Sequence, residues 1–293
     1  MSLEMLLVDA FTTRAYSGNP CAVFFDAGNL SESQMQRIAQ EMNQSESAFI
    51  QKVDGNHVQA RYFTPGEEIP MAGHPTVAVF HALLSTGRLD AGQRRFTLAL
   101  RAGTLDIEVS RGDQPLITMT QLAPKWGRDY PVPDVATVVG LNEDDIRADL
   151  PVQTVSTGTP LLMVPVKSLA ALERASLNQA AYQALWDRGD FFSIHLFVPR
   201  GINEKGQTFA RHFALDPDPT EDPFTGSATG AMACYLWHHG ELDKPAFTAQ
   251  QGHWLGRPGQ AQVEVLGQRQ AISGVKVGGS AVTVMAGRLA LLP

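Results

Sequence analysis

Three titratable side chains lie where a proton could be moved. Glu46 opens an apolar segment, His74 follows a glycine, and Asp222 precedes a proline. A carboxyl group or an imidazole can act as a general acid and base when its surroundings bring its pKa near the working pH. Each residue also has a plainer interpretation: a solvated turn carboxylate for Glu46, a helix-capping side chain for His74 and a turn aspartate for Asp222. The residues alone leave both interpretations open.

Two small-residue turns lie close to these groups, at residues 72–76 and 225–229, and each precedes an apolar run. Gly73 and Gly226 would let a ligand approach the bare backbone. The N–H groups at the start of a helix, together with its dipole, attract an anion. As a pair, the two turns predict a carboxylate or phosphate site, whereas each turn alone is explained as well by ordinary helix capping.

The surroundings of these turns occur twice in the chain, in the same order. In each copy a Gly-x-Pro opens a strand, an Ala-Arg-x-Phe follows, and a glycine then begins an apolar helix. The matched pairs are Gly18-Asn19-Pro20 with Gly158-Thr159-Pro160, ARYF at 60–63 with ARHF at 210–213, and GHPTVAVFHALLSTGRL from Gly73 with GSATGAMACYLWHHGEL from Gly226. The sequence therefore predicts two copies of one domain, residues 1–120 plus 281–293 and residues 121–280, with a site shared at their interface.

The helices after the two turns are apolar on nearly every face, as in VAVFHALL and AMACYLW. A helix of this kind must be surrounded by protein. Short strand-like segments fill much of the remaining sequence. We therefore expect an α+β fold of two pseudo-symmetric domains, each a curved, mostly antiparallel sheet wrapped around a central helix.

Local patterns place the other elements. The segment Ser31-Glu32-Ser33-Gln34 is a capping box that opens a helix to about Met42. Residues 124–133 contain three prolines and are predicted to be a linker. The expected strands are residues 6–8, 21–25, 47–52, 57–63, 96–100, 105–109, 116–119, 161–166, 191–198, 208–213, 261–266, 271–277 and 281–285, with a further helix over 180–186.

Composition argues against several function classes. The chain has 293 residues, a net charge of −7 and no run of Lys and Arg, so no nucleic-acid partner is expected. No apolar stretch approaches the about 20 residues of a membrane span and no signal peptide is visible, which predicts a cytoplasmic protein without a membrane partner. Cys21 and Cys234 lie in apolar runs and are expected to be buried free thiols. The eight histidines show no metal-ligand spacing, so no metal is expected.

Four segments resemble the PhzF-like family, which is named for the phenazine-biosynthesis isomerase. They are DAFTTRAYSGNPCAVF, NQSESAFI, RYFTPGEEIPMAGHPT and EDPFTGSATGAMACYL. The resemblance runs from about Val8 to the block Gly278-Gly279-Ser280-Ala281-Val282 and covers nearly the whole chain. The family resembles diaminopimelate epimerase in fold, and this implies two halves, each a sheet rolled around a central helix, with the active site between them.

The resemblance implies a role for each matching residue. Glu46 matches the family's catalytic acid/base glutamate, and His74 and Asp222 match polar partners that hold the substrate and help to move protons. The positions that match ligand-binding residues are Gly18, Asn19, Ser45, Gly73, Gly226 and Ser227. Related epimerases carry a cysteine at each helix start, whereas this chain has Ala72 and Thr225 there, so a mechanism with two thiols is not available.

Together these observations predict a cofactor-independent isomerase or epimerase that moves a proton on a small carboxylate-bearing metabolite, with Glu46 as acid and base in the interdomain cleft. The resemblance also implies a homodimer. Phe224 stands where the family often has a smaller residue, which predicts a narrower pocket, and Arg257 is explained by a structural ion pair or by substrate contact. The alternative function is a protein that binds a carboxylate metabolite without converting it, which would need only the two helix starts.

Overall fold

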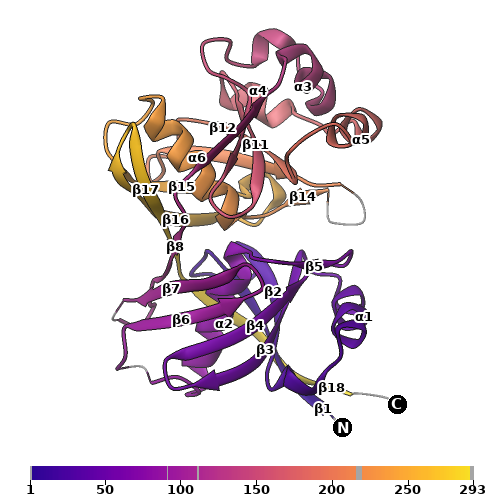
Figure 1. The fold of residues 1–293 in the computed structure, drawn as a ribbon, viewed down its shortest axis with the longest axis vertical. Coiled ribbons are helices and arrows are strands. Elements are labelled where there is room, and N and C mark those ends of the chain that lie inside the picture. The colour runs from indigo at the N-terminus through magenta and orange to yellow at the C-terminus, as the bar shows by residue number, and fades with distance from the viewer. Residues whose placement is uncertain (1, 91, 111, 216–219, 291–293) are drawn as a thin grey trace. The chain divides into compact units, whose positions relative to one another are not determined.

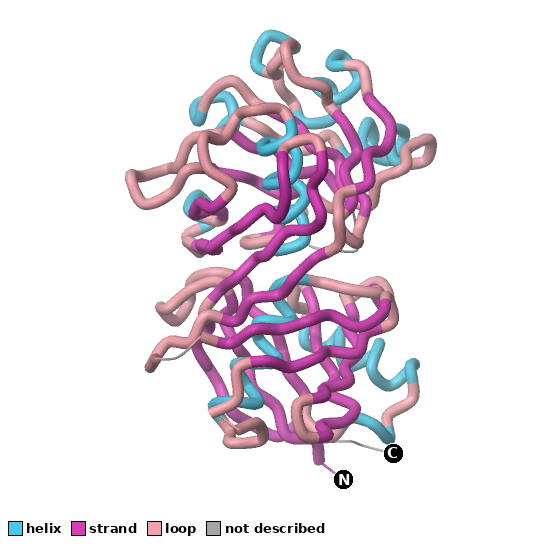
Figure 2. Tube along the Cα trace, turned by 60° about the vertical axis from the view of Figure 1, so that its left-hand side comes forward, coloured by secondary structure: helices cyan, strands magenta, loops and turns pink. Residues whose placement is uncertain are grey.

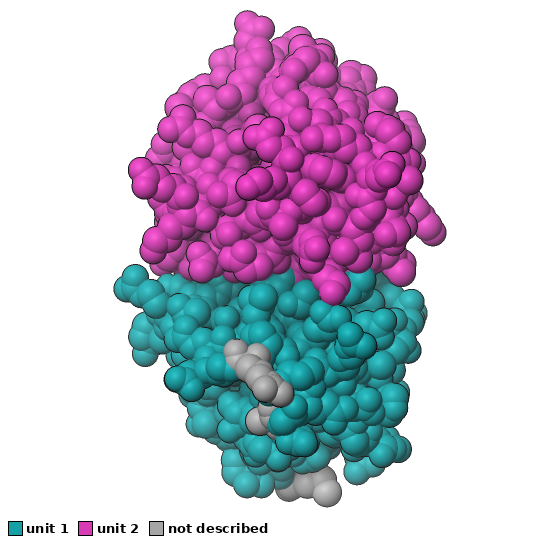
Figure 3. All heavy atoms as spheres, turned by 90° about the vertical axis from the view of Figure 1, so that its left-hand side faces the viewer, with its two compact units in different colours: residues 1–120, 278–293 teal, residues 121–277 magenta. Residues whose placement is uncertain are grey.

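The computed structural model describes residues 2–90, 92–110, 112–215 and 220–290 (Figure 1). The chain divides into two compact units: residues 1–120 with 278–293 form unit 1, and residues 121–277 form unit 2 (Figure 3). In each unit, many strands surround one long buried helix (Figure 2). The expected α+β fold is confirmed.

Unit 1 is built around helix α2 (Gly73–Ser85), which packs on four of its strands and has ten of its thirteen residues buried. The strands of the unit are β1 (Ser2–Ala10), β2 (Asn19–Phe24), β3 (Glu46–Asp54), β4 (His57–Phe63), β5 (Glu68–Ile69), β6 (Arg95–Leu100), β7 (Gly103–Val109), β8 (Ile117–Gln121) and β18 (Ala281–Ala290). Most neighbours are antiparallel, but β2 runs parallel to β3 and β4 runs parallel to β6. The burial of α2 on all sides explains why its sequence lacks a polar face.

Unit 2 repeats this pattern around helix α6 (Gly226–His238). Its strands are β9 (Lys125–Asp129), β10 (Gln153–Ser156), β11 (Pro160–Pro165), β12 (Ser193–Val198), β13 (Thr208–Phe213), β14 (Glu221–Asp222), β15 (Ala246–Gln251), β16 (Gly259–Gln268) and β17 (Ala271–Gly279). The parallel neighbours are again two, β11 with β12 and β13 with β15, at the positions equivalent to those of unit 1. This shared pairing pattern confirms the internal repeat.

Both units contain an arginine–glutamate ion pair at the same position of the repeat. In unit 1 the guanidinium of Arg61 donates hydrogen bonds of 2.8 and 2.6 Å to Glu68. In unit 2 Arg211 donates hydrogen bonds of 2.8 and 2.7 Å to Glu221. Each arginine also lies over the phenylalanine that ends its Ala-Arg-x-Phe motif. Because a two-point contact fixes the orientation of both side chains, the repeated motif has a structural role.

Shorter helices complete the units. They are α1 (Glu32–Met42) in unit 1 and α3 (Val132–Val139), α4 (Leu169–Arg174) and α5 (Gln179–Trp186) in unit 2, with 3-10 turns at Ala27–Asn29, Glu143–Asp145 and His253–Leu255. The capping box that was expected to open α1 is confirmed. The prediction of a linker over 124–133 is wrong, since this segment contains β9 and the start of α3. Pro131 is the N-cap of α3 and Pro133 lies in its first turn, where a missing N–H removes no helical hydrogen bond.

The cysteines and the helices bear on two of the expectations from composition. Cys21 and Cys234 are buried free thiols, as expected. Among the residues that the structure describes, none of the helices combines the length and the apolar character needed to cross a bilayer.

Candidate active site

Three side chains of unit 1 meet at the N-terminal end of α2. Asn19 opens β2, Glu46 opens β3, and His74 is the second residue of α2. The strands β2 and β3 are parallel neighbours with Cys21 opposite Glu46, so both begin at the same edge of the sheet. Because α2 packs on these two strands, its first turn carries His74 to that edge.

His74 is at the centre of this group. Its Nδ1 lies 2.8 Å from Glu46 Oε2 and 3.0 Å from Asn19 Nδ2. The side chains of His74 and Glu46 are 2% and 17% exposed, and Asn19 is fully buried, so water has little access to these contacts. The imidazole therefore faces two side chains of the sheet edge, which the interpretation as a simple helix cap does not explain.

Burial determines the protonation states of the His74 imidazole and of the neighbouring Cys21 thiol. The loss of water around the imidazole lowers the pKa of His74 to about 3, and the Pro20 carbonyl offsets only part of this effect. The ring is therefore neutral at pH 7. Burial, and then the charge of Glu46, raise the pKa of the Cys21 thiol well above its usual range, so the thiol stays protonated. The His74 ring and the Cys21 thiol are therefore both held in their neutral forms at pH 7.

The small residues predicted beside this group adjoin it in the chain. Gly18 has a φ of 58°, and a Cβ there would lie 2.1 Å from the carbonyl oxygen of Ala10, so the turn before Asn19 requires glycine. Ser45 directly precedes Glu46, and Gly73 is the first residue of α2. Contacts of Gly18, Ser45 and Gly73 with a ligand stay predictions.

Asp222 lies at the equivalent edge of unit 2. It ends β14, and its carboxylate accepts a hydrogen bond from the hydroxyl of Thr225, the N-cap of α6. The buried side chain of Gln251 joins the two, since it donates to the Asp222 carbonyl over 2.7 Å and accepts from the Thr225 N–H over 3.2 Å. Gly226 and Ser227 are the first two residues of α6. No sequence pattern marks Gln251, because its contacts depend on where the end of β15 lies in the fold.

The strand register shows what unit 2 carries at the position of Glu46. Cys21 lies opposite Glu46 in unit 1, and Leu161, which also follows a Gly-x-Pro, lies opposite Ser193 in unit 2. The Oγ atom of Ser193 lies 2.8 Å from Nε2 of His212, and both side chains are buried. Burial lowers the pKa of His212 to about 3. Unit 2 therefore has a neutral, hydrogen-bonded serine where unit 1 has a carboxyl group.

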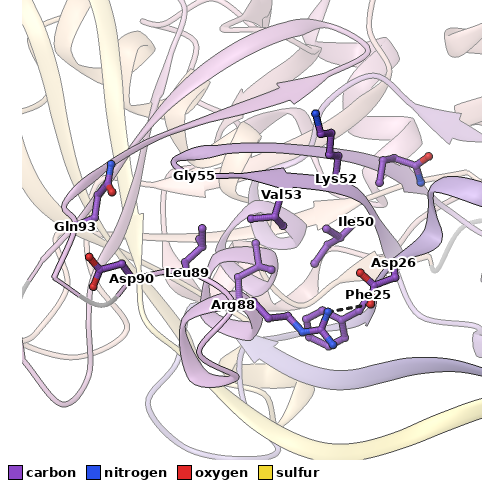
Figure 4. Close-up of a pocket in the computed structure, with 12 residues that line it drawn as sticks. Phe25, Asp26, Ile50, Lys52, Val53, Gly55, Arg88, Leu89, Asp90 and Gln93 are labelled. Carbon is purple, nitrogen blue, oxygen red and sulfur yellow. Dashed lines mark hydrogen bonds and ion pairs between the residues drawn. The ribbon is translucent and has the colours of Figure 1, made fainter.

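Two cavities lie at the other ends of the central helices. In unit 1 a cavity of about 490 Å³ is lined by residues that include Phe25, Arg88 and Leu89, just past the end of α2 (Figure 4). The corresponding cavity of unit 2 measures about 620 Å³ and includes Leu242, which matches Leu89 in the repeat. A helix of 13 residues is about 20 Å long, so the unit 1 cavity is separate from the group around His74. Within the described residues, no three His, Cys, Asp or Glu side chains are placed to hold a metal ion.

Known proteins resemble this chain in sequence and in fold over nearly its whole length. Residues 8–287 match a family described as phenazine biosynthesis-like protein. The chain is 32% identical to the uncharacterized isomerase YfhB of Bacillus subtilis, over 89% of this chain and 90% of that protein. It is 31% identical to the trans-2,3-dihydro-3-hydroxyanthranilate isomerase of Pseudomonas fluorescens, over 98% of this chain and 99% of that enzyme. Among solved structures, a PhzF-family phenazine biosynthesis protein of Bacillus anthracis matches with a TM-score of 0.89 and 29% identity, over 99% of this chain and 100% of that chain.

Proposed function

The chain belongs to the phenazine biosynthesis-like, or PhzF, family and is an isomerase, and we propose that it moves a proton between two carbon atoms of a small carboxylate-bearing metabolite. Glu46 takes the proton from one carbon and returns it to the other. The observation that carries this proposal is the 2.8 Å contact between the carboxyl group of Glu46 and the neutral, buried ring of His74.

The reaction begins with the carboxylate form of Glu46. It takes a proton from a substrate carbon, and the electron pair of the broken C–H bond moves into the adjacent unsaturated system of the substrate. The protonated carboxyl group then donates its proton to a second carbon, where an electron pair of that system forms the new C–H bond. Atoms and charge balance without a co-reactant. His74 holds the carboxyl group in place between the two transfers.

One acid/base group is sufficient for this chemistry. At the position equivalent to Glu46, unit 2 carries Ser193, whose hydroxyl group is bonded to His212. Burial keeps the thiol of Cys21 protonated, so it does not act as a second base. These features support a mechanism with a single carboxyl group over the two-base mechanism of a racemase.

The start of α2 supplies donors for negative charge on the substrate. The N-cap residue Ala72 has no side chain that could bond the first N–H groups of the helix. In α6 the N-cap residue Thr225 directs its hydroxyl group to Asp222 instead of to its own helix. Helix starts of this kind stabilise a carboxylate or a developing negative charge. That both helix starts, with Asp222 and Ser227, act on one substrate stays a prediction.

The proposed substrate is an unsaturated carboxylic acid with an acidic C–H bond. The relative from Pseudomonas fluorescens is named as an isomerase of trans-2,3-dihydro-3-hydroxyanthranilate, and this compound belongs to the same chemical class. Phe224 is fully buried in unit 2, and its effect on the width of a pocket stays a prediction. A protein that only binds a carboxylate would need the helix starts but not the Glu46–His74 contact, so this contact favours the isomerase.

Incorporation of solvent deuterium tests the proposed function. Carboxylates retained by the protein from a cell lysate, and trans-2,3-dihydro-3-hydroxyanthranilate as a first probe, are incubated with the protein in D₂O and analysed by mass spectrometry. Incorporation at carbon above the rate in buffer supports an isomerase. A ligand that is retained but gains no deuterium supports the binding protein instead.

We also propose a homodimer, for which the family resemblance is the main reason. Static light scattering at micromolar concentration should give about twice the mass of one chain. The mass of a single chain would contradict the proposal.

A further inference from the structure

One buried glutamine of unit 2 holds the first peptide group of α6. Gln121 ends β8 and is 2% exposed. Its side-chain nitrogen donates over 3.0 Å to the carbonyl of Gly226, the first residue of α6, and its side-chain oxygen accepts from the hydroxyl of Thr157 over 2.7 Å. Because a backbone carbonyl can only accept, the nitrogen of the amide must be the atom that faces Gly226. Both ends of the Gln121 amide are therefore fixed.

The sequence of α6 makes room for this side chain. A Cβ on Gly230 would overlap the amide oxygen of Gln121 and lie 2.7 Å from the amide carbon. A glycine inside a helix is destabilising relative to alanine. The helix does not itself require glycine at this position, because α2 has the fully buried Val77 at the equivalent position of the repeat. Gly230 is explained by the side chain that it accommodates.

The carbonyl of Gly226 shares a peptide group with the N–H of Ser227. A peptide group of this kind is planar and trans, so its C=O and its N–H point in opposite directions. The Ser227 N–H is one of those that a helix leaves without an internal partner, since the backbone ladder of α6 begins with the bond of 2.9 Å from the Thr229 N–H to the Thr225 carbonyl. A hydrogen bond that holds the Gly226 carbonyl therefore also sets the direction of a donor at the helix start.

We propose that Gln121 is a positioning residue, which holds the Gly226 carbonyl and thereby directs the N–H of Ser227 at a carboxylate of the substrate. This inference rests on the proposed function and deepens it, since it names a donor for the charge of the substrate and the side chain that orients this donor. Gly226 has no Cβ, so its backbone is less restricted than that of a residue with a side chain, and the bond from Gln121 supplies the restriction. The same bond polarises the peptide group, which makes its N–H a stronger donor.

Backbone ¹⁵N relaxation of the free protein tests this inference without a substrate. The Ser227 amide of the wild-type protein should have the order parameter of rigid backbone, about 0.85. In Gln121→Met, which keeps the length of the side chain but has no donor, this order parameter should fall below about 0.7, toward the value of flexible backbone. The matched control is Thr157→Val, which removes the other hydrogen bond of Gln121 but keeps its donor to Gly226. This control should have a lower melting temperature and a rigid Ser227 amide.

The KM for deuterium incorporation gives the second readout. With a carboxylate that the wild-type protein labels in D₂O, the KM of Gln121→Met should rise about tenfold, the effect of weakening one hydrogen bond to a charged group. Its kcat should stay within about twofold of the wild-type value, because Glu46 is unchanged. A merely structural role of Gln121 would lower the melting temperature and leave both the KM and the Ser227 amide as they are in the wild-type protein.

Alanine at position 230 separates packing from positioning. Gly230→Ala alone should destabilise the protein, because its methyl group overlaps the amide of Gln121. Combined with Gln121→Ala it should recover much of the melting temperature, since the overlap is gone and alanine is the better helix former. The Ser227 amide of this double variant should nevertheless be mobile, because the donor to Gly226 is absent. The double variant also serves if Gln121→Met does not fold.

Three results would overturn the inference. They are a mobile Ser227 amide in the wild-type protein, folded Gln121 variants in which this amide is as rigid as in the wild-type protein, and an unchanged KM in a variant in which it is mobile. The proposed function fails by a different result, deuterium incorporation that persists in Glu46→Gln, so the two failures are distinguishable.

Discussion

The three polar side chains of the cluster at the start of α2 differ in their burial and charge. His74 is 2% exposed and neutral, Asn19 is fully buried, and Glu46 retains 17% exposure. The resemblance predicts that Glu46 and His74 belong to the site, and the structure places their side chains 2.8 Å apart. The resemblance also places Asn19 among the ligand-binding residues, but a motif does not specify which way an amide points. That direction depends on the packing of α2 against the two strand starts.

Burial of both cysteines predicts that neither thiol takes part in the reaction. Burial raises the pKa of Cys234 to about 12 and that of Cys21 well above its usual range. The folded protein should therefore be nearly inert to Ellman's reagent at pH 8, whereas in urea both thiols should react. A thiol that reacts in the folded protein as fast as free cysteine would contradict this interpretation and reopen a role for Cys21.

At the scale of the elements, the two central helices were predictable and the helix α3 was not. An apolar run after a glycine has one explanation, a helix enclosed by strands, and both α2 and α6 match it. The prolines at 131 and 133 suggest a linker, but they sit at the start of α3, where proline is tolerated. No sequence pattern predicted that Ser193 occupies, in unit 2, the position that Glu46 has in unit 1. This equivalence depends on the strand register.

The turn that opens β2 should tolerate no side chain at Gly18. Gly18 and Gly55 have nearly the same φ, 58° and 60°, but a Cβ at Gly18 would meet the Ala10 carbonyl at 2.1 Å and a Cβ at Gly55 would meet nothing within 4 Å. Gly55→Ala should cost about 1 kcal/mol, from the backbone conformation alone. Gly18→Ala should cost about 1–3 kcal/mol more, because the backbone must shift. Urea unfolding measures both, and equal losses would contradict the steric argument.

At the scale of the whole molecule, each unit encloses neutral histidines. His74 is buried in unit 1, and His195 and His212 are buried in unit 2 with 3.2 Å between their Nδ1 atoms. Burial lowers the pKa of all three, to about 3 for His74 and His212. In the unfolded chain these rings titrate near pH 6.5. Below that pH the unfolded state binds more protons than the folded state.

The stability of the protein should therefore fall as the pH drops below about 6.5, before most carboxylates titrate. Each buried ring should contribute up to about 1.4 kcal/mol per pH unit to the decline in the free energy of unfolding. His212→Tyr, which introduces the residue that unit 1 has at Tyr62, should make the decline between pH 6.5 and 5 shallower. Urea unfolding across this range measures it, and a free energy that does not change with pH would contradict the assignment of neutral buried rings.

The central claim is that the carboxyl group of Glu46 carries the proton, and Glu46→Gln tests it most directly. Glutamine is nearly isosteric but cannot accept and return a proton. With a carboxylate that the wild-type protein labels in D₂O, Glu46→Gln should incorporate deuterium about 10²–10⁴-fold more slowly, at an unchanged melting temperature. The control is Glu67→Gln, which neutralises an exposed glutamate of unit 1 and should label at the wild-type rate. Labelling by Glu46→Gln at the wild-type rate would contradict the account.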